Sequence, residues 1–214
     1  MLDLWFSRVE GPQCRGEAYY FRFADDFVVC FQYPEDARGF MERLESRLGK
    51  FGLGLAKEKT RRIEFGRFAR KDAYRRGEKP AEFTFLGFTH YCGKSKNGHF
   101  KVKRRTSRKK FAQSLRALSD WARQARCKQR KSEFLKRAKA RVEGHLNYYA
   151  ITDNAQRCNS YLYHATHLVH KWLNRKSQRG PYNWAEFNQV LKWVGWPRVC
   201  IRKDLNPFRR AAAY

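Results

Sequence analysis

The run from Tyr19 to Phe31 constrains the fold of this chain most, because two adjacent carboxylates interrupt a stretch of apolar and aromatic residues. Aromatic and β-branched residues favour strands, and an Asp pair favours a tight turn, so the run predicts a β-hairpin with Asp25 and Asp26 at its tip. Adjacent carboxylates repel each other, and burial beside apolar strands would add to that cost. A divalent cation removes both penalties, and hard oxygen ligands suit Mg²⁺. The alternative is a solvent-exposed turn without a ligand, which a bare Asp-Asp pair favours.

The charge of the chain narrows the class of partner. The 214 residues carry 47 Lys and Arg against 20 Asp and Glu, a formal net charge of +27. Self-repulsion of that size destabilises a compact state unless a polyanion is usually bound, and nucleic acid is the obvious polyanion. A membrane surface is the rival, but the sequence has no run of about 18 apolar residues, so no span across a bilayer is predicted.

The N-terminal residues and the cysteines both indicate a protein that is not exported. The start of the chain, residues 1–6, lacks a basic leader and an extended apolar core, so we do not interpret it as a signal peptide. The six cysteines form no CxxC element, which argues against a zinc module. A disulfide framework is not expected in a chain of this size without an export signal, so free thiols in a reducing compartment are predicted.

Apolar spacing predicts a mixed order of helices and strands after the hairpin. Residues 34–51 have helical spacing and should cover one face of a sheet. Alternation at 63–65 indicates another strand, and the basic residues 66–82 indicate a loop. Residues 83–89 and 100–103 are expected to be two paired strands, with an Asn-Gly turn signal in their connection.

Helical patterns occupy the rest of the chain. Their ranges are 111–125, 135–149, 153–172 with Asp153 as the N-cap, and 184–194 after a break at Gly180-Pro181. Helices with one apolar stripe and short links should pack as a bundle.

The surface of this bundle is predicted to be cationic. From Lys94 to Arg141 there are nineteen Lys and Arg, with only Asp120 and Glu133 as acids. A merely solvated face usually mixes signs, so we interpret the single sign as a track for RNA phosphates. Its candidate residues are Lys103, Arg104, Arg105, Arg108, Lys109, Lys110, Arg123, Arg126, Lys128, Arg130 and Lys131.

Aromatic and histidine side chains add candidates for RNA contact. Tyr148 could stack on an unpaired base, whereas Tyr149 continues the apolar stripe and should be core. His164, His167 and His170 fall three apart on one helix, a spacing that surrounds a metal ion poorly. Contacts to RNA, or packing, are the favoured interpretations of these histidines.

The order of these motifs resembles the C-terminal half of a bacterial group II intron reverse transcriptase, also called an intron-encoded maturase. Phe23-Ala24-Asp25-Asp26 is similar to the family's catalytic Tyr-Ala-Asp-Asp box, and Gly52–Leu55 with Lys59-Thr60 to its next polymerase motif. Phe85-Leu86-Gly87-Phe88 is similar to its primer-grip box. Gly144–Tyr149 and the helix at Trp184 resemble its thumb, or domain X.

The resemblance implies an α+β fold with two parts. Residues 1–103 would be a partial polymerase palm, with antiparallel strands, a covering helix and a primer-grip hairpin. Residues 104–214 would be an all-α thumb and maturase bundle that binds RNA.

The resemblance also implies roles, partners and a location. Asp25 and Asp26 would hold two Mg²⁺ ions for nucleotidyl transfer, and Lys59 would be a general acid for the leaving group. Phe85, Leu86, Gly87 and Phe88 would press the primer end toward the metals. The implied partners are group II intron RNA and an RNA template with a DNA primer, in the cytoplasm of a bacterium. For Lys59 a solvated loop residue, and for the primer grip a plain buried strand, are the alternatives.

The sequence departs from the family pattern in two ways. Phe23 stands where the family usually has Tyr, which keeps the ring and loses a hydroxyl that the metals do not need. The family's first catalytic aspartate, its fingers and its template-positioning box lie upstream of the part that this chain resembles. We therefore expect no primer extension by this polypeptide alone, and a separate N-terminal fingers and palm polypeptide is a candidate partner.

Two other function classes stay open at this point. The first is a non-catalytic splicing cofactor or RNA chaperone, in which the Asp pair is a relic. The second is cyclic-nucleotide synthesis on a related palm, which is weak because Phe23-Ala24 stands where that family has Gly-Gly.

Overall fold

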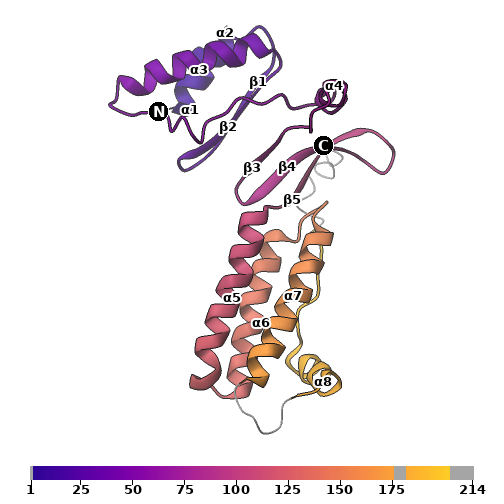
Figure 1. Cartoon of the computed structure of the whole chain (residues 1–214). Coiled ribbons are helices and arrows are strands. Elements are labelled where there is room, and N and C mark those ends of the chain that lie inside the picture. Colours follow the sequence, from indigo (N-terminus) through magenta and orange to yellow (C-terminus); the bar gives the residue numbers. More distant parts are fainter. Residues whose placement is uncertain (1, 176–181, 203–214) are drawn as a thin grey trace, which may run out of the picture. The chain divides into compact units, whose positions relative to one another are not determined.

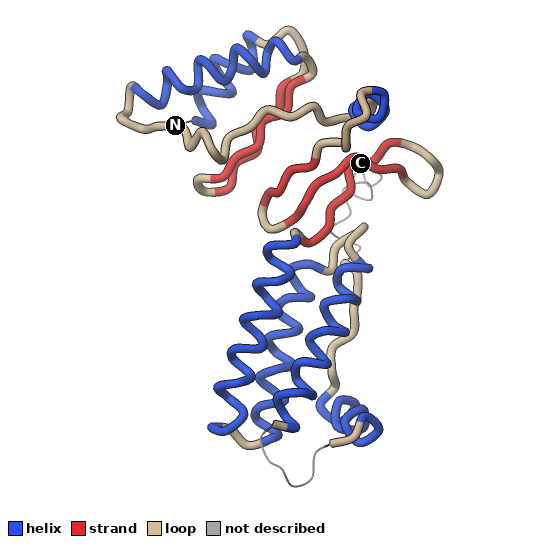
Figure 2. Tube along the Cα trace, in the orientation of Figure 1, coloured by secondary structure: helices blue, strands red, loops and turns tan. Residues whose placement is uncertain are grey.

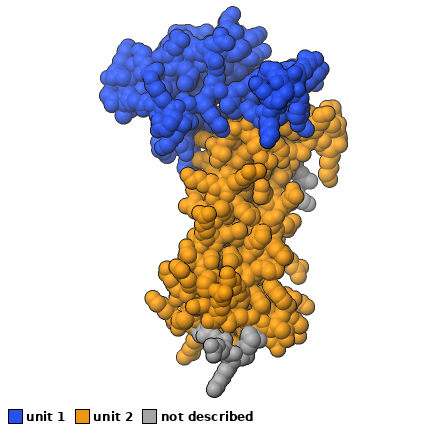
Figure 3. Space-filling view, viewed as in Figure 1, with its two compact units in different colours: residues 1–81 blue, residues 82–214 orange. Residues whose placement is uncertain are grey.

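A computed structural model describes residues 2–175 and 182–202 (Figure 1). The chain divides into two compact units, residues 1–81 and residues 82–214, which Figure 3 shows in separate colours. We call them unit 1 and unit 2 and describe each by itself. Helices and small antiparallel sheets are mixed in the described part, as expected for the α+β class (Figure 2).

Unit 1 is built around the predicted hairpin. Strands β1 (Ala18–Phe23) and β2 (Asp26–Phe31) pair antiparallel, and α3 (Pro34–Gly49) covers one face of the pair. The helix begins at a proline, follows it with two acids that suit the positive end of the helix dipole, and buries Phe40, Leu44 and Leu48. This confirms the hairpin and its covering helix.

The start of unit 1 stays helical through a proline. The turns α1 (Leu2–Trp5), η1 (Phe6–Glu10) and α2 (Gly11–Gln13) follow one another, and Phe6 joins the core under α3. Pro12 stands at the first turn of α2, where a missing backbone N–H costs little.

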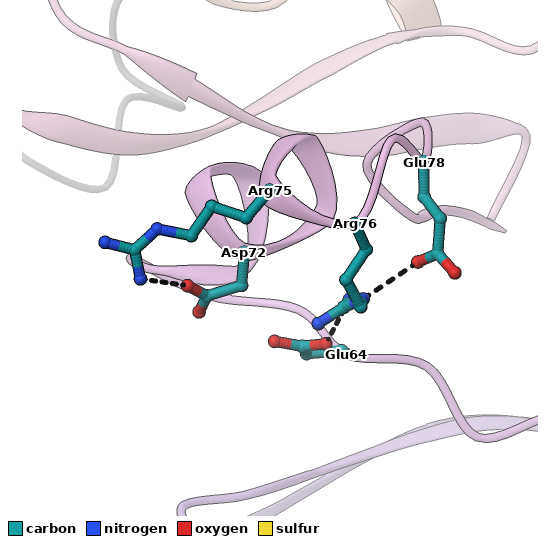
Figure 4. Close-up of polar contacts among 5 residues, drawn as sticks. All are labelled: Glu64, Asp72, Arg75, Arg76 and Glu78. Carbon is teal, nitrogen blue, oxygen red and sulfur yellow. Dashed lines mark hydrogen bonds and ion pairs between the residues drawn. The ribbon is translucent and has the colours of Figure 1, made fainter.

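The second half of unit 1 differs from the expected pattern. Residues 63–65 form no strand, so that prediction was wrong. Residues 66–82 are not only loop, because α4 (Ala69–Arg75) forms within them. Figure 4 shows how its end is held: Arg76 donates to Glu64 at 2.8 Å and to Glu78 at 3.0 Å. A helix flanked by ion pairs among residues 64–78 therefore lies in a segment whose composition indicated a loop.

Unit 2 begins with a three-stranded antiparallel sheet in the order β3-β4-β5. Its strands are β3 (Glu82–Phe85), β4 (Phe88–Lys94) and β5 (Phe100–Thr106). The single strand expected over 83–89 is instead two strands with a turn at Leu86-Gly87. Both turn residues have positive φ, 50° and 79°, which reverses the chain where alternation alone predicted continuation.

Three long helices follow side by side, with a fourth packed on them. They are α5 (Arg108–Lys128), α6 (Lys131–Tyr149), α7 (Ala155–Asn174) and α8 (Trp184–Val194) (Figure 1). Leu118, Val142 and Ala165 are buried where α5, α6 and α7 meet, and Phe187 of α8 is buried in the same core cluster as Phe134 of α6. The helical patterns are thus confirmed; the predicted break at Gly180-Pro181 lies outside the described residues.

One side chain ties the sheet to the bundle and takes the N-cap position expected for Asp153. Asn154 precedes α7 and is 1% exposed. Its Oδ1 accepts from the Thr106 backbone N–H at 2.9 Å, and its Nδ2 donates to the Tyr149 carbonyl at 2.8 Å. Asp153 instead has a positive φ of 73° and pairs with Lys101 at 2.8 Å. The ends of β5 and α6 and the start of α7 therefore meet at one buried amide.

The boundary between the compact units differs from the predicted domain boundary at 103/104. The units divide at Ala81 and Glu82, because the β3–β5 sheet packs with the helices. Phe88 of β4 lies in the same core cluster as Leu118 of α5 and Leu146 of α6. The assignment of palm and thumb roles to residues 1–103 and 104–214 stays a prediction.

Two further expectations concern cysteines and membranes. All six cysteines are free thiols. Within the described ranges, no helix has the length and apolar content to cross a bilayer.

Candidate functional site

Asp25 and Asp26 lie at the apex of the β1–β2 hairpin. Phe23 pairs with Asp26, so Ala24 and Asp25 form a two-residue loop and Asp26 opens β2. Ala24 has a φ of 54°, the sign that a type II′ turn requires at its first central residue, where glycine is preferred. A non-glycine residue there stores strain on the order of 1 kcal/mol. The hairpin turn is therefore formed at a local cost.

Arg22 braces this turn. Its guanidinium donates to the Ala24 carbonyl at 3.2 Å and forms a bidentate ion pair with the Asp3 carboxylate at 2.6 and 2.9 Å. The hydrogen bond from Arg22 lowers the pKa of the Asp3 carboxyl and, in return, raises that of the guanidinium. Sequence reasoning missed this pair, because no local pattern relates positions 3 and 22.

The carboxylates of Asp25 and Asp26 are both exposed. The expectation that burial adds to their repulsion is therefore wrong, because water screens charges at an exposed turn. Within the described residues, neither carboxylate has a hydrogen bond or an ion pair with another side chain. Two adjacent hard oxygen donors can hold part of a Mg²⁺ coordination shell. Over the same residues, no three His, Cys, Asp or Glu side chains are grouped to hold an ion, so the pair does not complete a metal site.

An aromatic surface adjoins the acids. Tyr19, Phe21 and Phe23 alternate along β1 and are all exposed. Residues opposite each other in an antiparallel pair share a face, so Asp26, the partner of Phe23, lies on this same face. The other face of the hairpin is the one packed on Phe40 and Leu44 of α3.

Lys59 lies in the loop of unit 1 that follows α3. It is exposed, and its backbone N–H donates to the Ala56 carbonyl at 2.9 Å in a turn. The neighbouring Lys57 is paired with Glu45 at 2.8 Å. Both proposed roles of Lys59, general acid and solvated loop residue, are compatible with this position.

The predicted primer-grip residues Phe85, Leu86, Gly87 and Phe88 form the β3–β4 turn. Tyr148 of α6 donates its hydroxyl to the Leu86 carbonyl at 2.9 Å, and the Ser107 N–H donates to the Gly87 carbonyl at 2.9 Å. A Cβ at Gly87 would lie 2.6 Å from the Tyr149 hydroxyl. The glycine thus permits the close approach of the Tyr149 hydroxyl. The primer-grip role of these four residues stays a prediction.

Tyr148 and Tyr149 take different places. Tyr149 is buried, as predicted. Tyr148 is half-exposed, stacks on Phe88 with ring centroids 5.6 Å apart, and has its hydroxyl bound to Leu86. Its contact with RNA stays a prediction, and its contact with the turn is a second role that the sequence did not reveal.

His145, one turn before Tyr149, is a buried neutral group. Its ring stacks on Tyr161 with centroids 3.5 Å apart, and its Nε2 has no partner within the described residues. Burial lowers the pKa of His145 to about 4 and raises that of Tyr161 to about 12. This histidine therefore packs the bundle as an uncharged ring at neutral pH.

The predicted phosphate track is split into two clusters at opposite ends of α5. The sheet-end cluster is Lys103, Arg104, Arg105, Arg108, Lys109 and Lys110; the link cluster is Arg123, Arg126, Lys128, Arg130 and Lys131. Along α5 their nearest members, Lys110 and Arg123, are 13 positions apart (123 − 110), which is about 20 Å at 1.5 Å per residue. A single ligand that contacts both clusters must span at least that length.

Three cations of the sheet-end cluster occupy an unfavourable place. Arg108, Lys109 and Lys110 fill the first turn of α5, which contains no acid, although the positive end of a helix dipole disfavours cations. All three are exposed. By contrast, Arg105 is neutralised by Glu82 at 2.6 Å. The first turn of α5 is thus the part of the cluster best suited to an external anion.

The link cluster contains an arginine held over an aromatic ring. The Arg126 guanidinium lies 5.0 Å from the centre of the Trp172 ring, and its buried Nε has no partner within the described residues. Arg123 faces Asp120 at 3.8 Å, whereas Lys128 and Arg130 are exposed in the α5–α6 link.

Residues 3–90 match the family model of the reverse transcriptases (RNA-dependent DNA polymerase). The match includes the Asp25-Asp26 hairpin, Lys59 and the Leu86-Gly87 turn, and it supports a reverse transcriptase family for this part of the chain. That family implies binding of a nucleic acid template. No curated protein and no solved structure matches the chain.

Proposed function

We propose that this chain is part of a group II intron reverse transcriptase and maturase, and that it binds intron RNA mainly through unit 2. The observation that carries the proposal is the match of residues 3–90 to reverse transcriptases, with two adjacent exposed carboxylates at the apex of a hairpin inside the matched segment. The finer assignment to intron-encoded proteins rests on the resemblance of the four ordered motifs, from Phe23–Asp26 to Gly144–Tyr149.

RNA binding is supported by how the charge is distributed. Of the 47 Lys and Arg, 30 lie in residues 82–214, which contain only 7 of the 20 acids. Unit 2 therefore carries nearly all of the excess positive charge of the chain. Cations without acids in the first turn of α5 add a site where a phosphate would relieve an unfavourable helix-end interaction.

Asp25 and Asp26 would hold Mg²⁺ together with oxygen ligands from a nucleotide or from another polypeptide. When bound, the ion would polarise phosphate oxygens in nucleotidyl transfer. Arg22 and Asp3 would keep the turn in place, and Lys59 is the proposed proton donor to the leaving group. Because the described residues group only two of the needed carboxylates, we expect no extension of a primed RNA template by this chain alone with Mg²⁺ and deoxynucleotides.

Metal binding can be tested without activity. Mn²⁺, a paramagnetic substitute for Mg²⁺, should broaden the NMR signals of residues 22–28, and Asp25→Asn with Asp26→Asn should remove the effect. The control is Glu35→Gln with Asp36→Asn, because this second adjacent acidic pair lies at the start of α3. Robust primer extension by the chain alone, or broadening that survives the Asp25 and Asp26 changes, would contradict this part of the proposal.

RNA binding is tested with a salt series on a structured intron RNA. Phosphate contacts release counterions, so the logarithm of the affinity should fall linearly with the logarithm of the salt concentration. Lys109→Ser with Lys110→Ser should weaken binding and reduce the steepness of that line by about two, roughly one for each lost contact.

The matched control for this series removes two exposed lysines of unit 1. Lys50→Ser with Lys57→Ser changes the net charge equally, so an equal loss would indicate only a general charge effect. Undiminished affinity of the unchanged protein at high salt would refute the phosphate contacts.

The second candidate function is a non-catalytic splicing cofactor or RNA chaperone. It is supported by the charge distribution, because the excess positive charge belongs to unit 2 and the Asp pair belongs to unit 1. The two functions differ in whether DNA is synthesised when a complementing fingers and palm polypeptide is added. A polymerase part should then support DNA synthesis, which Asp25→Asn with Asp26→Asn should abolish, whereas a splicing cofactor should support none. Both functions predict that this double change leaves the assistance of intron splicing intact.

A further inference from the structure

An aromatic cluster on α7 and α8 contains no residue of either cationic cluster, although Lys131 of the link cluster lies 4.6 Å from the ring of the nearby Tyr182. The His167 ring is 4.0 Å from the Tyr163 ring and 4.7 Å from the Trp184 ring, between centroids. Tyr163 is 60% exposed and Trp184 is 42% exposed. Two large rings are thus presented to solvent on adjacent helices, joined by an imidazole.

The imidazole between the rings is fixed in orientation. His167 Nδ1 lies 2.8 Å from the Tyr163 carbonyl, and since a carbonyl can only accept, Nδ1 carries the proton. His167 Nε2 has no partner within the described residues. One nitrogen is therefore left to bond an incoming group.

The position of α8 against α7 is also fixed. Asn174 accepts from the Tyr182 N–H at 2.9 Å and donates to its carbonyl at 2.8 Å, just before α8. Asn183 and Glu186 then form a capping box at the start of that helix. These bonds hold Trp184 beside His167 and His170 before any ligand arrives.

The surroundings of the cluster suit an anionic ligand. Helix α7 contains no Asp or Glu along its 20 residues, and Lys171 follows His167 by one helical turn. Glu186, two residues after Trp184, is engaged in the capping box.

We propose that Tyr163, His167 and Trp184 form a stacking site for an unpaired nucleobase of bound RNA. The site rests on the RNA binding proposed above and adds to it a place where single-stranded RNA is preferred to duplex. Single-stranded RNA is commonly held by aromatic faces that stack on splayed bases, with a nearby cation for the phosphate. Lys171 would take that phosphate.

A nucleobase fits this cluster better than a protein partner does. Helix α7 has no acid and carries Lys171 in its last turn, which suits the phosphate that accompanies a nucleobase. Three rings also offer far less area than the roughly 800 Å² per partner of a stable protein interface.

The test uses the full chain and two RNA probes. One is an unpaired oligoribonucleotide of about 12 nucleotides with 2-aminopurine, long enough for a single-strand site. The other is a duplex of the same length. Tyr163→Ala should weaken binding of the single strand about 5- to 100-fold, the range for one lost stacked base, and should leave the duplex unchanged. Tyr163→Phe should retain binding, because it keeps the π-face.

Trp193→Ala is the matched control, because Trp193 is a 72% exposed ring on the same helix as Trp184 without a ring contact in the described residues. Far-UV circular dichroism of Tyr163→Ala checks that the bundle is retained.

The outcomes separate the stacking site from the proposed function. If the unchanged protein binds neither RNA, the proposed function fails and the site with it. If it binds both and Tyr163→Ala changes neither, or weakens both equally, only the stacking site is overturned. A loss of self-association with RNA binding intact would identify the cluster as a protein contact, which also overturns it.

Discussion

Gly87 occupies a position that only glycine fits without strain. Its φ of 79° lies in the left-handed region, and an added Cβ would lie 2.6 Å from the Tyr149 hydroxyl, which is too close for an unshifted contact. In the turn that it forms with Leu86, the Leu86 carbonyl accepts from the Tyr148 hydroxyl and the Gly87 carbonyl accepts from the Ser107 N–H. Backbone conformation and close approach thus impose the same residue.

Gly87→Ala should lower the free energy of unfolding of unit 2 by about 2–4 kcal/mol, from left-handed strain plus the clash with Tyr149. Urea unfolding followed by tryptophan fluorescence measures it. Gly98→Ala is the control, because Gly98 has the same φ of 79° with open space around it. It should show the strain alone, about 1 kcal/mol. Equal losses in the two variants would contradict the close-approach argument.

His145 makes the stability of the bundle depend on pH. Its folded pKa of about 4 lies below the ordinary value of 6.5, so between these values the unfolded chain binds more protons. Stability from this group is therefore complete above pH 6.5 and is lost as the pH falls toward 4. Between pH 7 and pH 5 the loss should be about 2 kcal/mol.

The measurement for His145 is urea unfolding at pH 7 and pH 5. His145→Phe should flatten the dependence, because it keeps a ring against Tyr161 and removes the proton site. His99→Gln, at an exposed position in the β4–β5 connection, should leave the slope unchanged. If the free energy of unfolding of His145→Phe still falls between pH 7 and pH 5, the pH dependence comes from another group, such as His90, whose pKa is also lowered by burial.

One buried amide, Asn154, bonds to residues of β5, α6 and α7 at their junction. Asn154 donates to the Thr106 hydroxyl at 2.8 Å as well as to the Tyr149 carbonyl, and accepts from the Thr106 N–H. Cys158 adds a bond to the same Tyr149 carbonyl at 3.3 Å. The sheet and the helices therefore form one unit, although their sequence patterns are those of separate parts.

Asn154→Ala should destabilise unit 2 by about 2–4 kcal/mol, because the Thr106 N–H is left buried without a partner. The urea midpoint is the readout. Asn159→Ala, on the exposed face of the first turns of α7, is the control and should cost less than about 0.5 kcal/mol. Similar losses in both variants would mean that the amide network does not hold the junction.

Positive charge is distributed unevenly between the two units of the molecule. Unit 1 holds 17 of the Lys and Arg with 13 acids, which nearly cancel, whereas unit 2 holds 30 with 7. Ion pairs such as Arg76 with Glu64 and Glu78 order unit 1, where partners exist (Figure 4). Unit 2 has too few acids for that, so its cations repel one another until an anion arrives.

Added salt should consequently stabilise unit 2. Raising NaCl from about 0.05 to 0.5 M shortens the Debye length severalfold and should raise its free energy of unfolding by about 1 kcal/mol or more. Tryptophan fluorescence reports this unit, because five of the six tryptophans lie in it. Glycerol serves as an uncharged control for general solvent effects. A fall in stability with salt would show that attractive ion pairs outweigh the repulsion.

The sequence by itself determined most of the local elements and the excess of positive charge. Alternating aromatic residues around Asp25 and Asp26 fixed the hairpin, and helical spacing fixed the covering helix and the bundle, because these patterns record which face of each element avoids water. The excess of positive charge also follows directly from the residue counts, without a structure.

Tertiary structure alone decided how distant residues meet. Arg22 reaches Asp3, Tyr148 reaches Leu86 and Asn154 reaches Thr106 across 19, 62 and 48 positions, and no local periodicity encodes such pairs. The strand expected over 83–89 turned back at Leu86-Gly87 because left-handed backbone there is held by hydrogen bonds from α6 and from Ser107. Side-chain bonds between remote segments, rather than propensity, set these features.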